Sequence, residues 1–403
     1  MARAFFMIHT KIPQGFRALG LSPSLLDKLD RLGFVTPTPI QVDAIPVALQ
    51  GRDLVGIAQT GTGKTLAFGL PMVMRLGSDR FGLVLAPTRE LAEQIESTFI
   101  QLGLRTALLI GGAPMGRQVS QLKARPTVVV ATPGRLMDHM GQRTVNLSRV
   151  AIVVLDEGDR MLDMGFAPTI RRILDQTPRD RQTMLFSATM PKEIADLSAQ
   201  YLRNPERVEI ARSGTAPEAV EQELVIVGKE EKPAVLGNLL AKTKGTVLVF
   251  SRTRHGARKL ARTVRAFGHT AAEIHSDRTL PQRRAALQGF KSGTYRVMVA
   301  TDIAARGIDV KDIALVINYD VPEHAEDYVH RIGRTGRAGA AGHAITLATP
   351  EQAGEVRDIE RLMHAELPRS PYSTSTIERP KPAAPARSVG KWGPRGPIRG
   401  RRR

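Results

Sequence analysis

Val150-Ala-Ile-Val-Val-Leu155 decides the fold of this chain, and Asp156-Glu157-Gly158-Asp159 follows it directly. A run of Val, Ile and Leu without polar alternation is typical of a strand buried on both faces of a parallel sheet. Ligands of such sheets gather at the carboxyl ends of the strands, where Asp156 and Glu157 stand. We therefore predict an α/β fold with an acidic site at the strand edge. Two adjacent acids alone are more typical of a solvated loop, so other motifs must support this site.

A glycine-rich octet precedes that strand in the chain, Ala58-Gln-Thr-Gly-Thr-Gly-Lys-Thr65. Gly61 and Gly63 let the backbone curl so that its amides point inward at a phosphate. Lys64 can reach the β- and γ-phosphates, and the Thr65 hydroxyl can bind Mg²⁺. A helix beginning near Lys64 would add the positive end of its dipole. The usual phosphate loop begins with Gly where this chain has Ala, so a plain glycine-rich turn is the alternative.

Together, the octet and the acidic box predict a nucleoside triphosphatase in which Asp156 holds Mg²⁺ and Glu157 polarises the attacking water. A third segment, His330-Arg-Ile-Gly-Arg-Thr-Gly-Arg337, carries three arginines separated by glycines. We predict that Arg334 and Arg337 reach across a cleft between two domains to the γ-phosphate. An arginine supplied in this way can be worth roughly 10³–10⁵ in rate. A loop that faces nucleic acid without a catalytic role is the alternative.

Composition limits the class of protein. A chain of 403 residues with 42% hydrophobic content is expected to form two or three domains. The absence of cysteine excludes disulfides, thiol catalysis and Cys-ligated zinc. No apolar stretch approaches the roughly 18 residues that span a bilayer, and Ala4-Phe-Phe-Met-Ile8 is shorter than a signal-peptide core. We expect a cytoplasmic protein with no membrane partner.

The formal net charge is +19, and it is unevenly spread along the chain. Residues 368–403 hold ten Lys or Arg and one acid in a Pro-, Ser- and Gly-rich context, which predicts a disordered basic tail. The charge balance favours a polyanionic partner, most simply nucleic acid. A membrane surface is disfavoured because no basic amphipathic helix with aromatic anchors is evident. The tail is predicted to tether this nucleic acid, with a solvated extension as the alternative.

Short apolar runs alternate with segments of helix length along both halves of the chain, which predicts βα units around two parallel sheets. The runs lie at residues 53–57, 82–85, 106–110, 127–130, 150–155 and 183–186, then 224–227, 246–250, 271–274, 296–299, 314–317 and 344–347. A polar, turn-rich break, Arg212-Ser-Gly-Thr-Ala-Pro217, separates the two series. We predict domains at residues 1–211 and 220–367, joined by a linker at 212–219.

These motifs, in this order, resemble the DEAD-box RNA helicases of superfamily 2 from about Phe16 to Leu367. The resemblance implies two tandem RecA-like domains, each a mainly parallel sheet flanked by helices, and an RNA-stimulated ATPase that uses ATP and Mg²⁺. Gly33-Phe-Val-Thr-Pro-Thr-Pro-Ile-Gln41 resembles the segment that reads adenine. The nucleotide contacts implied are Phe16, Gln41, Gln59, Thr60, Gly61, Thr62, Gly63, Lys64, Thr65 and Asp309, with Thr65 and Asp156 as metal ligands.

RNA is the partner that the resemblance implies, held through its sugar-phosphate backbone rather than its bases. Taken singly, each matching segment is also consistent with an ordinary strand-end turn. The RNA contacts implied are Pro87, Thr88, Arg89, Gly111, Gly112, Thr132, Pro133, Gly134 and Arg135 in the first half, and Arg252 and Thr301 in the second. The residues implied to couple hydrolysis to strand separation are Asp159, Ser187, Thr189 and His330.

The chain departs from the family at three positions: Gly158 replaces Ala, Ser276 replaces Gly, and Leu280 replaces Gln. We expect activity to survive at Gly158. The expected function is local, ATP-dependent separation of short RNA duplexes by a monomer. Its partners would be single-stranded and short duplex RNA and ribonucleoprotein or ribosomal precursors. The alternatives are an ATP-gated RNA clamp or remodelling platform that opens no duplex, a DNA translocase, and a small-molecule kinase.

Overall fold

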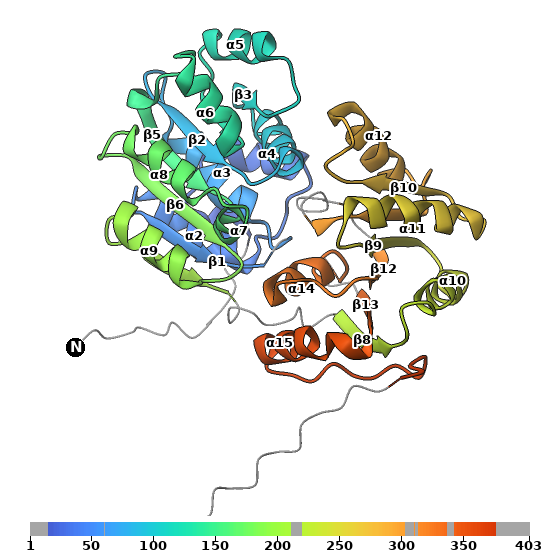
Figure 1. Ribbon diagram of the computed structural model, residues 1–403. Helices are drawn as coiled ribbons and strands as arrows, with labels where there is room; N and C mark the ends of the chain where they lie inside the picture. Colours follow the sequence, from blue (N-terminus) through green and yellow to red (C-terminus); the bar gives the residue numbers. More distant parts are fainter. Residues whose placement is uncertain are drawn as a thin grey trace, which may run out of the picture.

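The structure is a computed structural model that describes residues 15–59, 61–210, 220–302, 310, 313–336 and 342–375. These residues form two α/β domains, blue to green and yellow to red in Figure 1. Four predictions lie outside the described residues: the roles of Thr60, Asp309 and Arg337, and the linker at 212–219.

The first domain contains one seven-stranded parallel sheet of order β3-β4-β2-β5-β6-β1-β7. All six apolar runs predicted in this half are strands. The seventh strand, β7, was not predicted, because Glu206-Arg-Val-Glu209 contains a single apolar residue. The strands are β1 Leu54–Ile57, β2 Phe81–Leu85, β3 Thr106–Leu109, β4 Val128–Ala131, β5 Val150–Leu155, β6 Gln182–Ser187 and β7 Glu206–Glu209.

Helices cover both faces of this sheet, as Figure 1 shows. Several of these helices have proline in the first turn. Proline lacks an N–H there, but this costs no hydrogen bond, because the first N–H groups of a helix have no acceptor within the helix. The helices are η1 Phe16–Leu19, α1 Pro23–Arg31, α2 Pro39–Leu49, α3 Lys64–Arg75, α4 Arg89–Gln101, α5 Met115–Lys123, α6 Pro133–Gly141, η2 Leu147–Arg149, α7 Gly158–Asp163, α8 Ala167–Asp175 and α9 Lys192–Tyr201.

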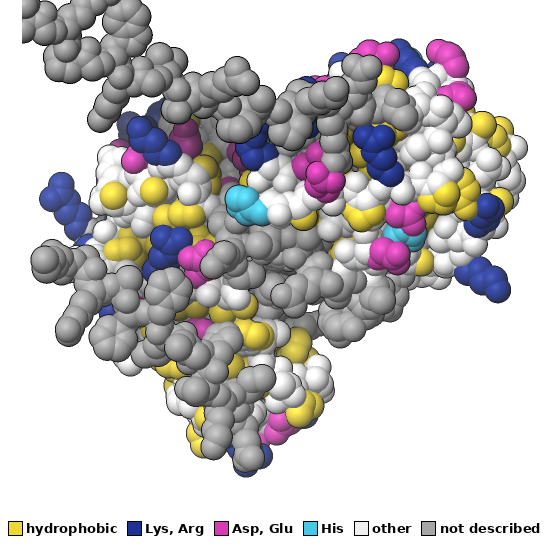
Figure 2. Space-filling model, turned by 90° about the horizontal axis from the view of Figure 1, so that it is seen from below, with side chains coloured by type: hydrophobic (Ala, Val, Ile, Leu, Met, Phe, Trp, Pro, Cys, Tyr) yellow, Lys and Arg dark blue, Asp and Glu magenta, His cyan; other side chains and the backbone are white. Residues whose placement is uncertain are grey.

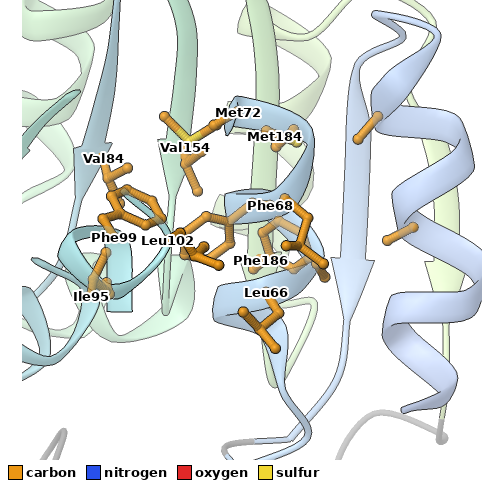
Figure 3. Close-up of a cluster of buried hydrophobic side chains, with 14 of the residues drawn as sticks. Leu66, Phe68, Met72, Val84, Ile95, Phe99, Leu102, Val154, Met184 and Phe186 are labelled. Carbon is orange, nitrogen blue, oxygen red and sulfur yellow. The ribbon is translucent and has the colours of Figure 1, made fainter. Parts of the chain in front are cut away.

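Helix α3, which follows the phosphate loop, is fixed by aromatic packing. Figure 3 shows its Phe68 between Phe99 of α4 and Phe186 of β6. The ring centroids lie 6.1 Å and 5.4 Å from that of Phe68. All three rings are fully buried, so the start of α3 is held at a fixed place beside the sheet.

The second domain repeats the plan with a six-stranded parallel sheet of order β10-β11-β9-β12-β13-β8. The predicted runs are again strands, and only the polar first half of β8 was not predicted. The strands are β8 Val220–Ile226, β9 Thr246–Phe250, β10 Ala271–Ile274, β11 Val297–Ala300, β12 Ile313–Asn318 and β13 Gly342–Ala348. The helices are α10 Lys232–Lys242, α11 Arg254–Ala266, α12 Leu280–Lys291, α14 Ala325–Ile332, η3 Pro350–Gln352 and α15 Ala353–Met363.

The second domain extends past Leu367, where the disordered tail was predicted to begin. Residues 368–375, here called the C-terminal strap, lie along the outer edge of β8. Leu224 donates its backbone N–H to the Pro368 carbonyl and accepts from the Ser370 N–H, both at 2.8 Å. Ser370 is buried. The prediction of disorder is therefore wrong for these eight residues, because backbone pairing with an edge strand needs no apolar periodicity. Residues 376–403 lie outside the described residues.

The surface is mixed in character where it can be seen. Figure 2 shows Lys and Arg side chains interspersed with Asp and Glu and with small apolar areas on one face. Within the described part of the chain, no helix is long and apolar enough to cross a membrane.

Candidate active site

The order of the strands sorts the predicted site residues along one edge of the first sheet. Strands β3, β4 and β2 are neighbours, and the predicted RNA-binding segments follow them. Strands β5, β6 and β1 come next, followed by the acidic box, Ser187-Ala-Thr189 and the phosphate loop. Because all the strands are parallel, all six segments leave the sheet at the same edge. The nucleotide side and the RNA side therefore meet at β5.

The phosphate loop has the conformation that the octet predicts. Gly63 caps α3 with φ 87° and ψ 21°, in the left-handed region that favours glycine. Lys64 is the first residue of α3, is buried, and donates from Nζ to the Ala58 carbonyl at 2.9 Å. Thr62 Oγ1 donates to the Gln59 carbonyl at 2.7 Å. The loop is thus folded around its own lysine.

Gln41 joins the predicted adenine-reading segment to this loop. Its Oε1 accepts from the Thr38 N–H and its Nε2 donates to the Gly63 carbonyl, both at 2.9 Å. A Cβ placed on Gly63 would lie 2.4 Å from Gln41 Nε2, so only glycine fits there. Phe16, the predicted upstream aromatic, is 4% exposed and lies in the core cluster of the first domain. The adenine contacts of both residues stay predictions.

The acidic box lies at the end of β5, as predicted. Asp156 is 2% exposed. Burial raises the pKa of its carboxyl to about 6, and the charge of Lys64 opposes that rise. Glu157 has φ 51°, which is left-handed backbone in a non-glycine residue. Its Oε2 lies 3.5 Å from Nη1 of the buried Arg160. The sequence analysis did not single out Arg160.

Asp159 lies close to the three other residues that are implied to couple hydrolysis to strand separation, Ser187, Thr189 and His330. Its Oδ2 accepts from the backbone N–H and the hydroxyl of Thr189, both at 2.8 Å, and its own N–H donates to Ser187 Oγ at 3.2 Å. The same Oδ2 lies 3.9 Å from Nε2 of His330 on α14. Figure 1 shows α14 next to α7 across the boundary between the domains. Asp159 therefore connects the acidic box to β6 and to the second domain.

Gly158, the departure from the family's acidic box, fills a tight position. A Cβ placed on it would lie 3.2 Å from Ile194 Cδ1, which is closer than an ordinary contact. Ile194 is fully buried. An alanine at position 158 would require Ile194 to move by a few tenths of an ångström.

The arginine-rich segment of the second domain is partly described. Arg334 is 3% exposed, and its Nε donates to the His330 carbonyl at 3.2 Å. Arg331, which was not predicted as a site residue, donates from Nε and Nη2 to the Asp302 carboxylate at 2.5 Å and 2.7 Å. Its Nη1 donates to the Asp320 carbonyl at 2.6 Å. Arg331 thus fastens the base of the segment that carries Arg334.

The predicted RNA-binding residues of the first domain assemble around the Gly111-Gly112 loop. Arg135 donates from Nε to the Ile110 carbonyl at 3.1 Å and from Nη2 to the Ala113 carbonyl at 2.5 Å, so it holds both ends of that loop. The guanidinium of Arg89 lies over the two glycines. The other members are also at the strand ends: buried Pro87 and Thr88 before α4, and Thr132, Pro133 and Gly134 at the start of α6.

Two buried polar residues that support this loop were not predicted. Gln118 Nε2 donates to the carbonyls of Ile110 and Ala113, each at 3.1 Å, and its Oε1 lies 3.2 Å from His139 Nε2. Burial and the nearby charge of Arg135 lower the pKa of the fully buried His139. No sequence pattern links residues this far apart, so only the fold reveals the support.

In the second domain, the predicted RNA contacts lie at neighbouring strand ends. Arg252 follows β9, and its Nη2 donates to the Val321 carbonyl at 3.0 Å. Thr301 follows β11, is half-buried, and donates its N–H to the Ile274 carbonyl at 3.3 Å. Strands β9 and β11 are paired, so the two residues leave the same edge of the sheet.

The two domains touch along a second line away from the acidic box. Arg283 Nε on α12 donates to Glu90 Oε1 on α4 at 2.7 Å, and both side chains are buried. Arg284 Nε, next on α12, donates to Glu93 Oε1 at 3.0 Å. Neither pair was predicted, because opposite charges far apart in a sequence give no sign that they meet.

Two family models match this chain. Residues 38–197 match the model described as DEAD/DEAH box helicase, and residues 231–339 match the helicase conserved C-terminal domain. The two matches cover the domains that carry the acidic box and the arginine segment. The chain belongs to the DEAD/DEAH box helicase family and is an enzyme of that class.

Known relatives agree with this assignment. DEAD-box ATP-dependent RNA helicase 30 of Arabidopsis thaliana is 43% identical over 402 residues, covering 96% of this chain and 68% of the relative. Dbp5 of S. cerevisiae bound to RNA and ADP BeF3 has a TM-score of 0.81 and 30% identity, over 89% of this chain and 95% of that one. A DEAD box protein from Methanococcus jannaschii has a TM-score of 0.53 and 37% identity, over 88% and 99%. The predicted tandem RecA-like fold is confirmed.

Proposed function

We propose that this chain hydrolyses ATP between its two domains and uses the closing of that cleft to separate short RNA duplexes. The observation that carries the proposal is the 3.9 Å approach of Asp159 Oδ2 to His330 Nε2 across the domains. The same oxygen accepts two bonds from Thr189, so a change at the acidic box is passed to β6 and to α14 together. A rigid connection of this kind can couple chemistry to movement.

The placement of the two domains supports this proposal. The whole chain superposes better on the Dbp5 complex with RNA and ADP BeF3 (TM-score 0.81) than on the M. jannaschii protein (TM-score 0.53). The second protein is nevertheless closer in sequence. A different relative placement of two similar domains would produce a lower whole-chain score despite the higher identity. We take this arrangement as the closed state.

In the closed state, Lys64 would exchange its bond to the Ala58 carbonyl for the β- and γ-phosphates of ATP. The Thr65 hydroxyl and the Asp156 carboxylate are hard oxygen donors that suit Mg²⁺. Mg²⁺ usually keeps several waters and binds through one or two carboxylates together with substrate phosphates, so these two side chains would be sufficient protein ligands. When bound, Mg²⁺ neutralises charge on those phosphates. Gln41 retains a second N–H and a second lone pair for the adenine edge.

Glu157 would orient and deprotonate the attacking water, and Arg334 would stabilise charge on the γ-phosphate. Glu157 has left-handed backbone directly after β5, and Arg160 Nη1 lies 3.5 Å from Oε2 of its carboxylate. Arg334 follows His330 by one helical turn, so the contact of His330 with Asp159 brings this arginine to the domain boundary. Cleft closure would then be a condition of hydrolysis.

RNA would bind across the strand ends that carry Arg89, Gly111-Gly112 and Arg135 in the first domain and Arg252 and Thr301 in the second. Small residues, hydroxyls and arginines suit contact with a sugar-phosphate backbone without base reading. We further propose that the protein works as a cytoplasmic monomer on ribonucleoprotein or ribosomal precursors. Sedimentation tests whether the protein is a monomer. Capture of crosslinked RNA from cells tests which RNA it binds.

Steady-state ATP turnover with and without single-stranded RNA tests the core of the proposal, which predicts strong stimulation. Glu157→Gln should keep ATP binding and lose turnover by about 10²–10⁴-fold, the usual worth of a general base. Undiminished hydrolysis in that variant would remove Glu157 from its role. DNA of the same sequence is the control, because it lacks the 2′-hydroxyl.

An ATP-gated RNA clamp is the second candidate, since it would use the same contacts. A strand-displacement assay on a short RNA duplex separates the two functions. Release of the labelled strand that requires ATP supports unwinding. RNA-stimulated turnover without release supports the clamp.

A further inference from the structure

Leu280, the first residue of α12, buries its side chain in the opposite domain. It is 5% exposed, and every other buried member of its hydrophobic cluster belongs to the first domain. A Cβ placed on Gly112 would lie 3.6 Å from Leu280 Cβ, so the leucine faces the Gly111-Gly112 loop. The apolar contact between the domains is therefore made at the loop that is predicted to hold RNA.

The same loop is held from its own domain by Arg89. A Cβ on Gly112 would lie 2.7 Å from Arg89 Nη1, and a Cβ on Gly111 would lie 3.2 Å from Arg89 Nη2. Gly112 also has φ +83°, which favours glycine. The loop thus lies between an arginine of the first domain and a leucine of the second. A shift of Leu280 would change the space available to the loop and to Arg89.

Two ion pairs flank this apolar contact. Arg283–Glu90 is buried, and Glu90 is the neighbour of Arg89 in the chain. Arg284–Glu93 is more exposed, with 54% of the arginine side chain accessible. Exposed pairs contribute little and are screened by salt, whereas burial of a leucine side chain is not screened. Leu280 therefore supplies a salt-independent part of the contact between α12 and α4.

We propose that Leu280 is a positioning residue for RNA: on closure of the domains it presses on the Gly111-Gly112 loop and sets Arg89 for the RNA backbone. The resemblance implies glutamine at this position. In this chain, the contact between α12 and the Gly111-Gly112 loop is apolar, whereas a glutamine would have to make it through hydrogen bonds. The inference rests on the proposed function. By linkage, a residue that acts only in the closed state changes how strongly nucleotide and RNA favour each other's binding.

The test measures the affinity for a labelled single-stranded RNA, with and without a non-hydrolysable ATP analogue and Mg²⁺. The ratio of the two affinities reports the coupling. In Leu280→Ala this ratio should fall by roughly tenfold, within the usual range of coupling between sites. The RNA affinity without nucleotide and the analogue affinity without RNA should stay near wild type. The coupling ratio that remains in Leu280→Ala should decrease more steeply with increasing KCl than the wild-type ratio does. The reason is that the ion pairs between α12 and α4, which salt screens, then provide most of the contact.

Leu287→Ala is the matched control. Leu287 lies on the same helix but is half-buried against the core of the second domain, so its variant should keep the wild-type ratio. Leu280→Val, which truncates the same side chain less, should lose part of the coupling and remains available if the alanine variant unfolds. An unchanged ratio in Leu280→Ala, or an equal loss of RNA affinity with and without the analogue, overturns the inference. Absence of RNA stimulation in the wild type would instead overturn the proposed function.

Discussion

Both domains place a lysine at the first position of the helix after their first strand, but the two lysines are held differently. Lys64 Nζ donates to one carbonyl of its own glycine-rich loop, Ala58. Lys232 Nζ donates to the Tyr319 and Leu347 carbonyls, at 2.9 Å and 2.8 Å, and these follow or end two strands of the sheet. Lys64 thus bonds a single loop carbonyl, whereas Lys232 bridges two carbonyls near the ends of the neighbouring strands β12 and β13. This difference is consistent with the proposed binding role of Lys64 and indicates a structural role for Lys232.

Two buried arginines repeat this contrast. Arg331 of the second domain has a carboxylate and a carbonyl as hydrogen-bond acceptors. Arg160 of the first domain lies 3.5 Å from Glu157, and its Nε and Nη1 donate no hydrogen bond within the described residues. Unused donors in a buried place are costly, and they are expected where a site rearranges during its work. The two arginines therefore differ in how firmly they are held: Arg331 is fixed by hydrogen bonds, and Arg160 is not.

The largest expected effect compares the two lysines directly. Lys64→Met should lower RNA-stimulated ATP turnover by roughly 10²–10³-fold, the loss seen when one preorganised group at a developing charge is removed. Lys232→Met should leave turnover per folded molecule near wild type. The measurement is steady-state phosphate release, normalised to the folded fraction from circular dichroism. A Lys232→Met variant that folds but has no ATP turnover would contradict the structural role of Lys232.

The second prediction uses pH. Burial lowers the pKa of Lys232 to about 8, whereas in the unfolded chain this lysine stays protonated to higher pH. Between these values the unfolded state binds more protons, so the free energy of unfolding should rise with pH. Relative to Lys232→Met, wild type should gain about 2–3 kcal/mol from pH 8 to 10.5. Urea unfolding of both proteins across this range checks it, and a constant difference would contradict burial of the charge.

A smaller effect is expected at Arg160. Arg160→Met removes the cation beside Glu157, so kcat should fall about tenfold, or about 1.4 kcal/mol in the barrier. KM for ATP should change little, because Arg160 acts through Glu157. Arg160→Lys should recover part of the loss by keeping the charge. If kcat stays constant while stability falls, Arg160 is structural, and the contrast with Arg331 disappears.

The smallest effect concerns the end of the chain beyond the strap. Removing residues 376–403 should weaken RNA binding and flatten its salt dependence, with the slope falling by about 0.7 for each lost phosphate contact. The strap should be kept, because it pairs with β8. Affinity titrations at several KCl concentrations provide the slope, and an identical slope in both proteins would leave the tail as a solvated extension.

The fold could be predicted because buried parallel strands carry a signal in the local sequence. All twelve apolar runs became strands, and ten of the twelve contain two or more Val, Ile or Leu residues. The acidic box and the glycine-rich octet could be recognised for a related reason: the left-handed backbone at Gly63 favours glycine, and an acid directly after a buried strand is an uncommon pattern. Strand β7 and the strap were not predicted from the sequence. Backbone hydrogen bonds hold them in position, and their side chains show no apolar pattern.

The support of the site could not be predicted. Gln41 bonding the Gly63 carbonyl, Gln118 bonding the ends of the glycine loop, and Leu280 entering the first domain all join segments distant in the chain. The sequence drew attention to Gln41 and Leu280 for other reasons, but it did not indicate these contacts. Their roles depend on which strand ends become neighbours, and this follows from the sheet order rather than from the composition of any segment.

The C-terminal strap also bears on the solubility of the protein. An unpaired edge strand offers a row of N–H and C=O groups to which another copy of the chain can add. The strap occupies those groups at Leu224 and Ile226, and Ser373 Oγ accepts from the Ile226 N–H at 3.1 Å. A fragment cut at Leu367 would leave β8 bare, and such a fragment is expected to self-associate where one ending at Ser375 stays dispersed.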